Sequence, residues 1–364
     1  MMVRDLYKKL WNFDMNYREL GKTKRSAQIR SYLLDAVRLG KHQQMIAASQ
    51  EIFKVSRQTI HTHLSALVEM GYLVAHGNTR ARTYGLGSKR FHIQEFPLEN
   101  LRESEVYYQS FNYIFKDLPE NIESICHYGF TEMLNNAIDH SGGEVAHISV
   151  TRDENSVEIY ISDNGEGIFD HIARIMGLGD PRESILELSK GKLTTDPDNH
   201  TGQGIFFTSR TFDSFYVYAG DLIFSHDEGT DDYLLHNERE LEGGTLVSMQ
   251  IAMNSPRTLE DVFDAFTGTE DEDFAFNTTV VPVKLVLYEG EKLVSRSQAK
   301  RILNRVEKFN TVLLDFEGVD SIGQAFADEV FRVFARRNPH VNIEPTHTTN
   351  IIDRMILAAK SHTD

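Results

Sequence analysis

The order of four short motifs in the middle of the chain restricts the possible folds more than any other feature of the sequence. The first motif is Glu132 with Asn136, on a helix predicted over residues 120–141. A separation of four residues places both side chains on the same helix face, about one turn apart. Taken alone, such a pair is typical of any solvated helix face, so its meaning depends on the motifs that follow.

The other three motifs stand where predicted elements begin or end. Residues 145–161 alternate apolar and polar side chains, which predicts a β-hairpin whose second strand runs into the sequence DNGEG at 163–167. The sequence GQG at 202–204 precedes a predicted helix, and GGT at 243–245 opens a predicted strand. Each motif is weak by itself. All four in this order, each at an element boundary, form a specific pattern.

In this order the four motifs resemble those of the GHKL family of ATP-binding proteins, which includes gyrase, MutL, histidine kinases and anti-sigma-factor kinases. The resemblance covers residues 120–252 and implies a nucleotide pocket of the Bergerat type. It also implies an α/β sandwich with helices on one face of a mixed sheet. A dinucleotide-binding interpretation of 202–204 fails, because the third glycine of G-x-G-x-x-G would fall at Phe207.

The resemblance gives the polar residues distinct roles toward ATP. Asp163 would accept a hydrogen bond from the adenine amino group, supported by a water that Thr245 helps to hold. Asn136 would bind Mg²⁺ through its side-chain oxygen, which suits a cation that keeps several waters and adds phosphate oxygens. Glu132 would be the general base toward the water or hydroxyl that attacks the γ-phosphate.

The glycines of the motifs have a role in the same resemblance. Gly165 and Gly167 would let the backbone pass close to the base in dihedral angles that other residues avoid. Gly202 and Gly204, just before a helix, would offer backbone N–H groups to the phosphates, where the helix dipole also favours anions.

The segment between the DNGEG and GQG motifs is expected to be a lid that folds over the nucleotide. Lys192 and Thr194 are its candidate phosphate ligands, together with the neighbouring Lys190 and Thr195. A solvated loop explains any one of these side chains equally well, so the sequence does not choose between the two interpretations.

Charge is distributed unevenly along the 364 residues. Residues 1–98 contain 16 Lys and Arg against 7 Asp and Glu, whereas the remainder contains 22 against 47. The formal net charge of −16 therefore hides a first region at +9 joined to a remainder at −25. Unless surface charge has separated by chance, this asymmetry favours a basic nucleic-acid-binding module attached to an acidic one.

The basic region has the pattern of three helices and a hairpin. Apolar residues at helical spacing predict helices from Ser26 to Gly40, over residues 45–53, and from the N-cap Ser56 to Gly71. Two short strands are then expected around residues 77 and 78. This order resembles the winged helix-turn-helix of bacterial transcription regulators, over residues 26–87.

In that resemblance the third helix is the recognition helix and the hairpin is the wing. The start of the helix carries the side chains expected to contact DNA, which are Arg57, Gln58, Thr59, His61 and Thr62. On the wing, Arg80 and Arg82 are expected to lie against the phosphate backbone. Winged helices also serve as protein-docking modules, and that alternative stays open.

The end of the chain alternates predicted strands and helices, which implies a small mixed α/β layer. Residues 314–331 resemble the STAS-like domain called DUF4325 and, more distantly, the STAS fold of anti-sigma-factor antagonists. In those antagonists a GHKL kinase phosphorylates a serine at the start of a helix. Ser321 stands near that place with Ile322 in the acceptor position, so two interpretations of Ser321 remain: a phosphorylation site or a helix N-cap.

These patterns predict a multidomain α+β protein. Its expected domains are a winged helix at residues 1–96, a GHKL domain at 97–256 and a STAS-like domain at 257–364. The expected function is an ATP-responsive transcriptional regulator that uses ATP with Mg²⁺ and binds double-stranded operator DNA. We also expect a homodimer, with a STAS or sigma-factor-like protein as a further partner. Alternatives are a protein serine/threonine kinase and an ATPase that dimerises on binding ATP.

Several classes of protein are disfavoured by simple counts. No apolar run approaches the roughly 18 residues that span a bilayer, and the first residues lack the apolar core of a secretion signal. Cys126 is the single cysteine, which excludes an internal disulfide and a Cys-based zinc site. We therefore expect a cytoplasmic protein with no membrane partner.

Overall fold

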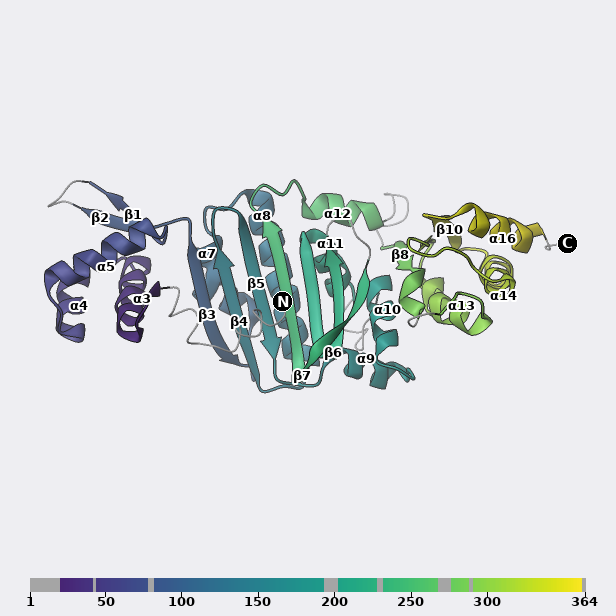
Figure 1. Ribbon diagram of the computed structural model, residues 1–364, viewed down its shortest axis with the longest axis horizontal. Coiled ribbons are helices and arrows are strands. Elements are labelled where there is room, and N and C mark those ends of the chain that lie inside the picture. The colour runs from purple at the N-terminus through teal and green to yellow at the C-terminus, as the bar shows by residue number, and fades with distance from the viewer. Residues whose placement is uncertain are drawn as a thin grey trace.

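The protein has three sheets arranged along its long axis, in the order of the chain (Figure 1). The computed structural model describes residues 20–41, 44–77, 82–192, 202–227, 232–267, 276–287 and 291–361. Within these residues the sheets have two, five and three strands, and each region has its own cluster of buried apolar side chains. The architecture is therefore mixed α+β with several sheets.

The first region contains three helices and a two-stranded antiparallel hairpin. Its elements are α3 (Lys24–Arg38), α4 (Met45–Phe53), α5 (Arg57–Glu69), β1 (Leu73–His76) and β2 (Thr83–Leu86). The predicted start of the third helix is confirmed, because the Ser56 hydroxyl accepts a hydrogen bond from the backbone N–H of Thr59 at 3.1 Å. Its predicted end is confirmed too, since the chain leaves the helix at Gly71 with φ of +80°.

A five-stranded sheet in the order β3-β4-β5-β7-β6 forms the centre of the molecule. Its strands are β3 (Arg90–Pro97), β4 (Val145–Arg152), β5 (Ser156–Asp163), β6 (Ser214–Asp227) and β7 (Tyr233–Ala252). All four pairings are antiparallel, so the expected mixed sheet is wrong. Two of the pairings, β4 with β5 and β6 with β7, join strands that only a few residues separate in the chain, and such short connections are possible only between antiparallel strands.

Strand β3 belongs to this sheet, although the expected first domain ran to residue 96. It pairs with β4 along its whole length, from Arg90 opposite Arg152 to Pro97 opposite Val145. Most of its residues are half-buried, with no strict alternation of buried and exposed positions. The central sheet therefore begins at residue 90.

Helices cover one face of the central sheet, with α8 and α11 behind it in the view of Figure 1. They are α6 (Glu103–Val106), a π turn (Tyr107–Phe111), α7 (Asn112–Phe115), α8 (Glu120–His140), α9 (Ile168–Met176), α10 (Arg182–Lys190), α11 (Gly204–Thr211) and α12 (Leu259–Phe266). The alternating Ile148, Val150 and Ile159 point into the core that α8 closes. Gly129 lets α8 pack closely, because a Cβ there would lie 2.4 Å from the ring of Phe212.

The last region is a parallel three-stranded sheet in the order β10-β9-β8, with helices around it. Its elements are β8 (Thr278–Pro282), a 3-10 turn (Val283–Val286), α13 (Arg296–Leu303), a 3-10 turn (Val306–Lys308), β9 (Thr311–Asp315), α14 (Gln324–Asp328), a π turn (Glu329–Phe334), α15 (Ala335–Arg337), β10 (Asn342–Thr346) and α16 (Asn350–Ser361). The predicted alternation of strands and helices is confirmed. Ser321 is not the N-cap of the following helix, because Gly323 holds that position.

Among the helices of the described residues, none is both long enough and apolar enough to cross a bilayer.

Candidate functional site

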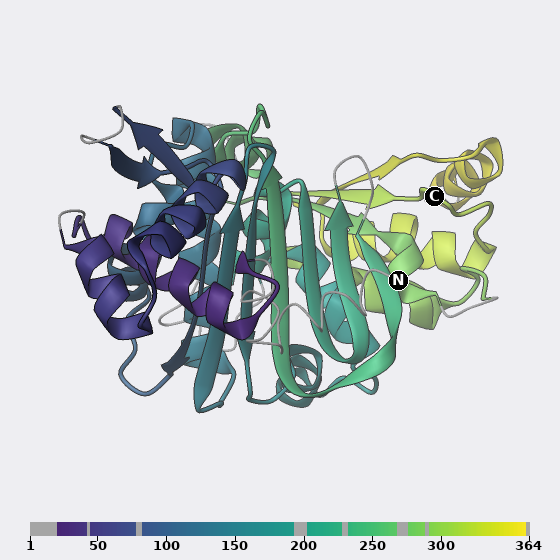
Figure 2. The ribbon, with the colours of Figure 1, turned by 60° about the vertical axis from the view of Figure 1, so that its left-hand side comes forward.

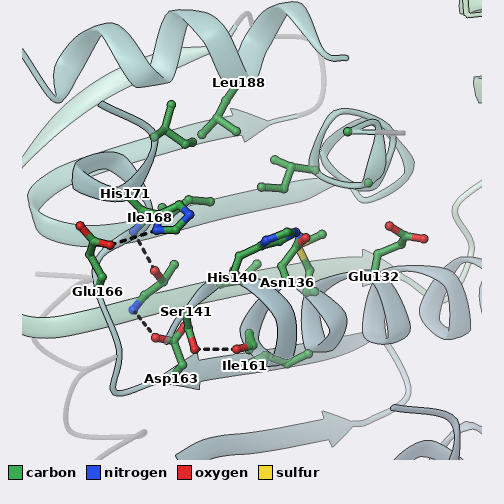
Figure 3. A pocket seen from close by; sticks show the side chains of 18 of the residues that line it. Glu132, Asn136, His140, Ser141, Ile161, Asp163, Glu166, Ile168, His171 and Leu188 are labelled. Carbon is green, nitrogen blue, oxygen red and sulfur yellow. Dashed lines mark hydrogen bonds and ion pairs between the residues drawn. The ribbon is translucent and has the colours of Figure 1, made fainter. Parts of the chain in front are cut away.

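A cavity of about 300 Å³ lies between α8, the end of β5, the interior of β7, and the helices α9 to α11. Six of the residues expected at the ATP site line it: Glu132, Asn136, Asp163, Gly202, Gly204 and Thr245. Figure 3 shows Glu132, Asn136 and His140 in a row along α8, with Asp163 beyond one end of the row, next to Ser141. The four motifs therefore meet around one cavity.

Asp163 ends β5 and holds three chain segments together at one end of the cavity. Its Oδ1 accepts hydrogen bonds from the backbone N–H groups of Gly165 at 2.9 Å and Thr245 at 3.3 Å. The Thr245 hydroxyl in turn accepts from the backbone N–H of Ile168 at 3.0 Å, at the start of α9. Burial raises the pKa of Asp163 to about 6, although both backbone donors oppose that shift.

The glycines around Asp163 lie in close packing, and the unusual dihedral angles predicted for Gly165 and Gly167 were wrong. Neither Gly165 nor Gly167 has a positive φ, and the φ of Gly167 is −61°. A Cβ on Gly165 would instead lie 2.1 Å from the carbonyl oxygen of Ser141. On the facing strand, Gly244 has φ of +73° and a Cβ there would lie 2.0 Å from the carbonyl oxygen of Asp163. Three backbones thus pass one another in contact.

At the other end of the cavity, the first turn of α11 faces Glu132. A Cβ on Gly204 would lie 2.2 Å from Oε2 of Glu132, so a larger residue there would require the Glu132 side chain to move. Gly202 has φ of +68° and turns the chain into the helix. The N-cap residue Gln203 makes no side-chain hydrogen bond to the first turn. Backbone N–H groups at such a start are available to an anion.

The lid lysines do not point into the cavity. Lys192 donates from Nζ to the carbonyl of Lys308 at 2.9 Å and lies over the ring of Phe309, in the C-terminal region. Lys190 is buried in an ion pair with Glu187. Neither side chain lines the cavity, because the C-terminal region supplies partners for both. Thr194 and Thr195 lie outside the described residues.

Sequence reasoning missed a charged group on the cavity wall. Glu166 accepts hydrogen bonds from Nδ1 of His171 at 3.0 Å and from Arg174 at 2.7 Å. The bond from Arg174 is the main reason that the pKa of Glu166 falls to about 2. Both Glu166 and His171 line the cavity, and Nε2 of His171 is buried with no hydrogen-bond partner among the described residues. A signal was present, because Glu166 lies inside the DNGEG motif.

Besides His140 and Ser141, the rest of the lining is apolar, so a planar ring could pack against it. They come from all the surrounding elements and are Met133, Ala137, Ile161, Ile168, Ile172, Leu188, Ile205, Phe206 and Val247.

The expected DNA-contacting residues lie on the first region, which Figure 2 brings to the front. Arg57, Gln58 and Thr62 are exposed on α5, whereas Thr59 and His61 are half-buried. Arg82 is exposed at the start of the second hairpin strand, and Arg80 lies outside the described residues. The helix start and the hairpin therefore carry accessible basic and amide groups.

Another cluster of polar side chains lies at the carboxyl ends of β9 and β10. Ligand atoms of Asp315, Glu317 and His347 lie within 4.8 Å of one another. However, Asp315 accepts from Nδ1 of His347 at 2.7 Å and from the backbone N–H of Glu317 at 3.0 Å. These hydrogen bonds account for the cluster without an ion.

Part of the C-terminal region, with two of the three strands of its sheet, matches a known domain family. Residues 298–353 match the STAS-like domain of unknown function (DUF4325). The match extends from within α13 to the start of α16 and includes β9 and β10. No curated protein compared with the chain matches it. Residues 298–353 are thus a STAS-like domain, and the residues that line the cavity lie outside this match.

Proposed function

We propose that the central cavity binds ATP with Mg²⁺ and that the protein is an ATP-responsive, DNA-binding transcriptional regulator. One observation carries the nucleotide proposal. A half-buried carboxylate, Asp163, stands at one end of a cavity whose other end holds Asn136, Glu132 and the open start of α11. A purine triphosphate has a hydrogen-bonding base at one end and anions at the other, which suits this arrangement.

The end of the cavity at Asp163 would hold adenine. Its carboxylate would accept a hydrogen bond from the exocyclic amino group, and the apolar lining would pack against the ring faces. Two backbone donors already fix Oδ1, so the carboxylate is oriented before a ligand arrives. A hydrogen bond to a charged group contributes about 1.5–3 kcal/mol, and its loss would weaken binding by tenfold or more at about 1.4 kcal/mol per decade.

The opposite end would hold the phosphates. The first-turn N–H groups of α11 would donate to phosphate oxygens, with Gly204 leaving room for a close approach. Asn136 offers an oxygen ligand of the kind Mg²⁺ takes, with waters and phosphate oxygens as the other ligands. Glu132 lies beside Gly204 and would take a proton from an attacking water or hydroxyl.

The first region would bind duplex DNA through α5 and the hairpin. Arg57 and Gln58 lie at the exposed start of α5, from which a recognition helix reaches base edges. Arg82 would contact the phosphate backbone. The net charge of +9 over residues 1–98 supports this assignment.

Calorimetric titration of the full chain with Mg-ATP tests the nucleotide proposal. We expect wild type to bind and Asp163→Asn to bind at least tenfold more weakly. Asp170→Asn is the matched control, because Asp170 is an exposed carboxylate on the neighbouring α9 and should leave the affinity unchanged. Wild type that gives no binding heat and does not retain labelled ATP would refute the proposal.

The DNA proposal needs a separate test. Bound duplexes would be selected from a random-sequence pool, and the affinity for the selected sequence measured with ATP, with ADP and without nucleotide. We expect the affinity to differ among the three conditions, since ATP can shift a conformation only through differential binding. An identical affinity in all three conditions would show that ATP does not control DNA binding.

A serine/threonine kinase is the alternative, and the STAS-like match favours it. Ser321 is half-buried before α14, which lies at the outer end of the molecule away from the central sheet (Figure 1). Transfer to Ser321 would therefore occur between molecules. Labelled γ-phosphate that appears on the protein, and is lost in Ser321→Ala, would support the kinase. Release of the label as inorganic phosphate would support the regulator.

A further inference from the structure

Helix α10 has one side against the cavity and another against the C-terminal region. Leu188 lines the cavity and belongs, with Ile185, to the core of the central region. Leu186 belongs instead to the core of the C-terminal region. One short helix is therefore part of the cavity wall and part of the neighbouring STAS-like domain's core.

Lys190, at the end of α10, is hydrogen-bonded both to its own helix and to the C-terminal region. Its side chain is 1% exposed, and its Nζ donates to Glu187 at 2.7 Å and to the carbonyls of Arg301 at 3.1 Å and Asn304 at 2.9 Å. An ammonium group has three donors, so all are used, two of them by the C-terminal region. The carbonyl of Lys190 accepts from the hydroxyl of Thr279 at 2.7 Å. Burial lowers the pKa of Lys190.

Glu187 is the second anchor of the same helix. Its side chain is 3% exposed, and its Oε2 accepts from Arg305 at 3.0 Å while Oε1 accepts from the amide of Asn304 at 3.2 Å. Arg305 also donates to the carbonyl of Lys192. Removing one partner from a buried charge strongly destabilises the folded state. The C-terminal region is therefore more stable against α10 when all of these contacts form than when only some of them do.

Helix α11 is joined by aromatic rings to α12 and to Phe276 of the C-terminal region. Phe206 lines the cavity, and its ring centre lies 4.7 Å from that of Phe276 and 5.0 Å from that of Phe266. Phe207 packs at 4.3 Å from Phe263. Both helices on the phosphate side of the cavity are thus held by the C-terminal core, α10 through charges and α11 through rings.

We propose that the STAS-like region completes the nucleotide site from outside, with Arg305 and Asn304 as positioning residues that act through α10. By holding α10, they place Leu188 in the cavity wall, while Phe276 packs against Phe206 of α11. This inference rests on the proposed nucleotide function. Because linkage is reciprocal, the nucleotide and the docking of the C-terminal region stabilise each other by the same factor.

The first test compares Mg-ATP affinity by calorimetry in full-length variants. Arg305→Ala is expected to weaken binding by about tenfold, the size of a typical coupling between sites. Arg305→Lys keeps the charge beside Glu187 and is expected to recover part of the affinity. Arg337→Ala, an exposed arginine of the same region, is the matched control and is expected to bind as wild type.

The second test uses wild type and so does not depend on how a variant folds. Hydrogen exchange of backbone amides in residues 298–310 is expected to slow when Mg-ATP is added, and not to slow in Asp163→Asn. If wild type binds Mg-ATP, but this exchange is unchanged and Arg305→Ala binds equally well, the inference is overturned while the nucleotide site stands. If wild type does not bind Mg-ATP, the proposed function itself falls.

Discussion

The two ends of the cavity are built in different ways. The end at Asp163 is made by the central region alone, where three backbones meet in contact and leave room only for glycine at Gly165 and Gly244. The wall at α10 instead depends on residues more than a hundred positions further along the chain, such as Asn304 for Lys190. The wall at α11 depends on rings further along the chain, such as Phe276 for Phe206. The first end is therefore preformed, whereas the second is open to control by another domain.

The largest effect is expected from removing the buried charge at the C-terminal end of α10. Lys190→Met leaves Glu187 with one cationic partner fewer in a buried site, and such losses cost about 3–5 kcal/mol. Denaturant unfolding should show this loss in free energy. Lys360→Met, at a lysine exposed on α16, is the control. Equal stability of the two variants would contradict the importance of the contact.

A smaller loss is expected at the preformed end. Gly165→Ala would place its Cβ 2.1 Å from a carbonyl oxygen, and forced overpacking costs about 1–3 kcal/mol. The same substitution should abolish Mg-ATP binding, because it moves the loop that orients Asp163. Gly179→Ala, where a Cβ meets nothing within 4 Å, should change neither stability nor affinity.

The raised pKa of Asp163 predicts a pH dependence for the nucleoside end. As the pH falls through about 6 the carboxylate gains a proton and loses the charge that strengthens its hydrogen bond to adenine. Adenosine, which has no phosphate to titrate, should bind several-fold more weakly at pH 5 than at pH 7, about the loss of a charge-assisted bond. A flat profile in wild type would contradict the assignment.

The same shift affects folding in the opposite direction. A carboxyl whose pKa is raised on folding stabilises the folded state fully below its unfolded pKa, and this stabilisation is lost as the pH rises through about 6. Asp163→Asn removes that dependence, so its unfolding free energy should vary less between acid and neutral pH than that of wild type. Denaturation at several pH values measures the difference.

The smallest effect is expected from Arg174, which is exposed on α9 and contacts Glu166. Exposed ion pairs contribute about 0.2–1 kcal/mol, so Arg174→Met should barely change stability. It should, however, raise the pKa of Glu166 and free the orientation of His171, which changes the wall of the cavity. A modest loss of adenosine affinity, measured by calorimetry, would place His171 beside the nucleoside.

Local signals account for what the sequence predicted correctly. A cap such as Ser56, or two side chains one helical turn apart such as Glu132 and Asn136, depends on only a few neighbouring residues. The alternation in 145–161 likewise identifies a hairpin without knowledge of its partners. These short-range patterns were enough to identify six residues that line one cavity.

Long-range partners account for what the sequence did not predict. The direction of Lys190 and Lys192 is decided by carbonyl groups of the C-terminal region, which no local pattern reveals. Strand β3 was missed because its half-buried residues lack a clear period, and its pairing with β4 decides its place. Gly165 was recognised as necessary, but the contact that requires it comes from Ser141 on another element.

Crystals of the full chain soaked with magnesium and a non-hydrolysable ATP analogue give the most direct test of the central claim. The predicted result is adenine against Asp163, phosphates at the first turn of α11 and Mg²⁺ at the side-chain oxygen of Asn136. A known ATP-binding protein soaked in the same way is the positive control. If the control binds the analogue, an empty cavity in this protein, or an analogue bound elsewhere on the chain, would contradict the claim.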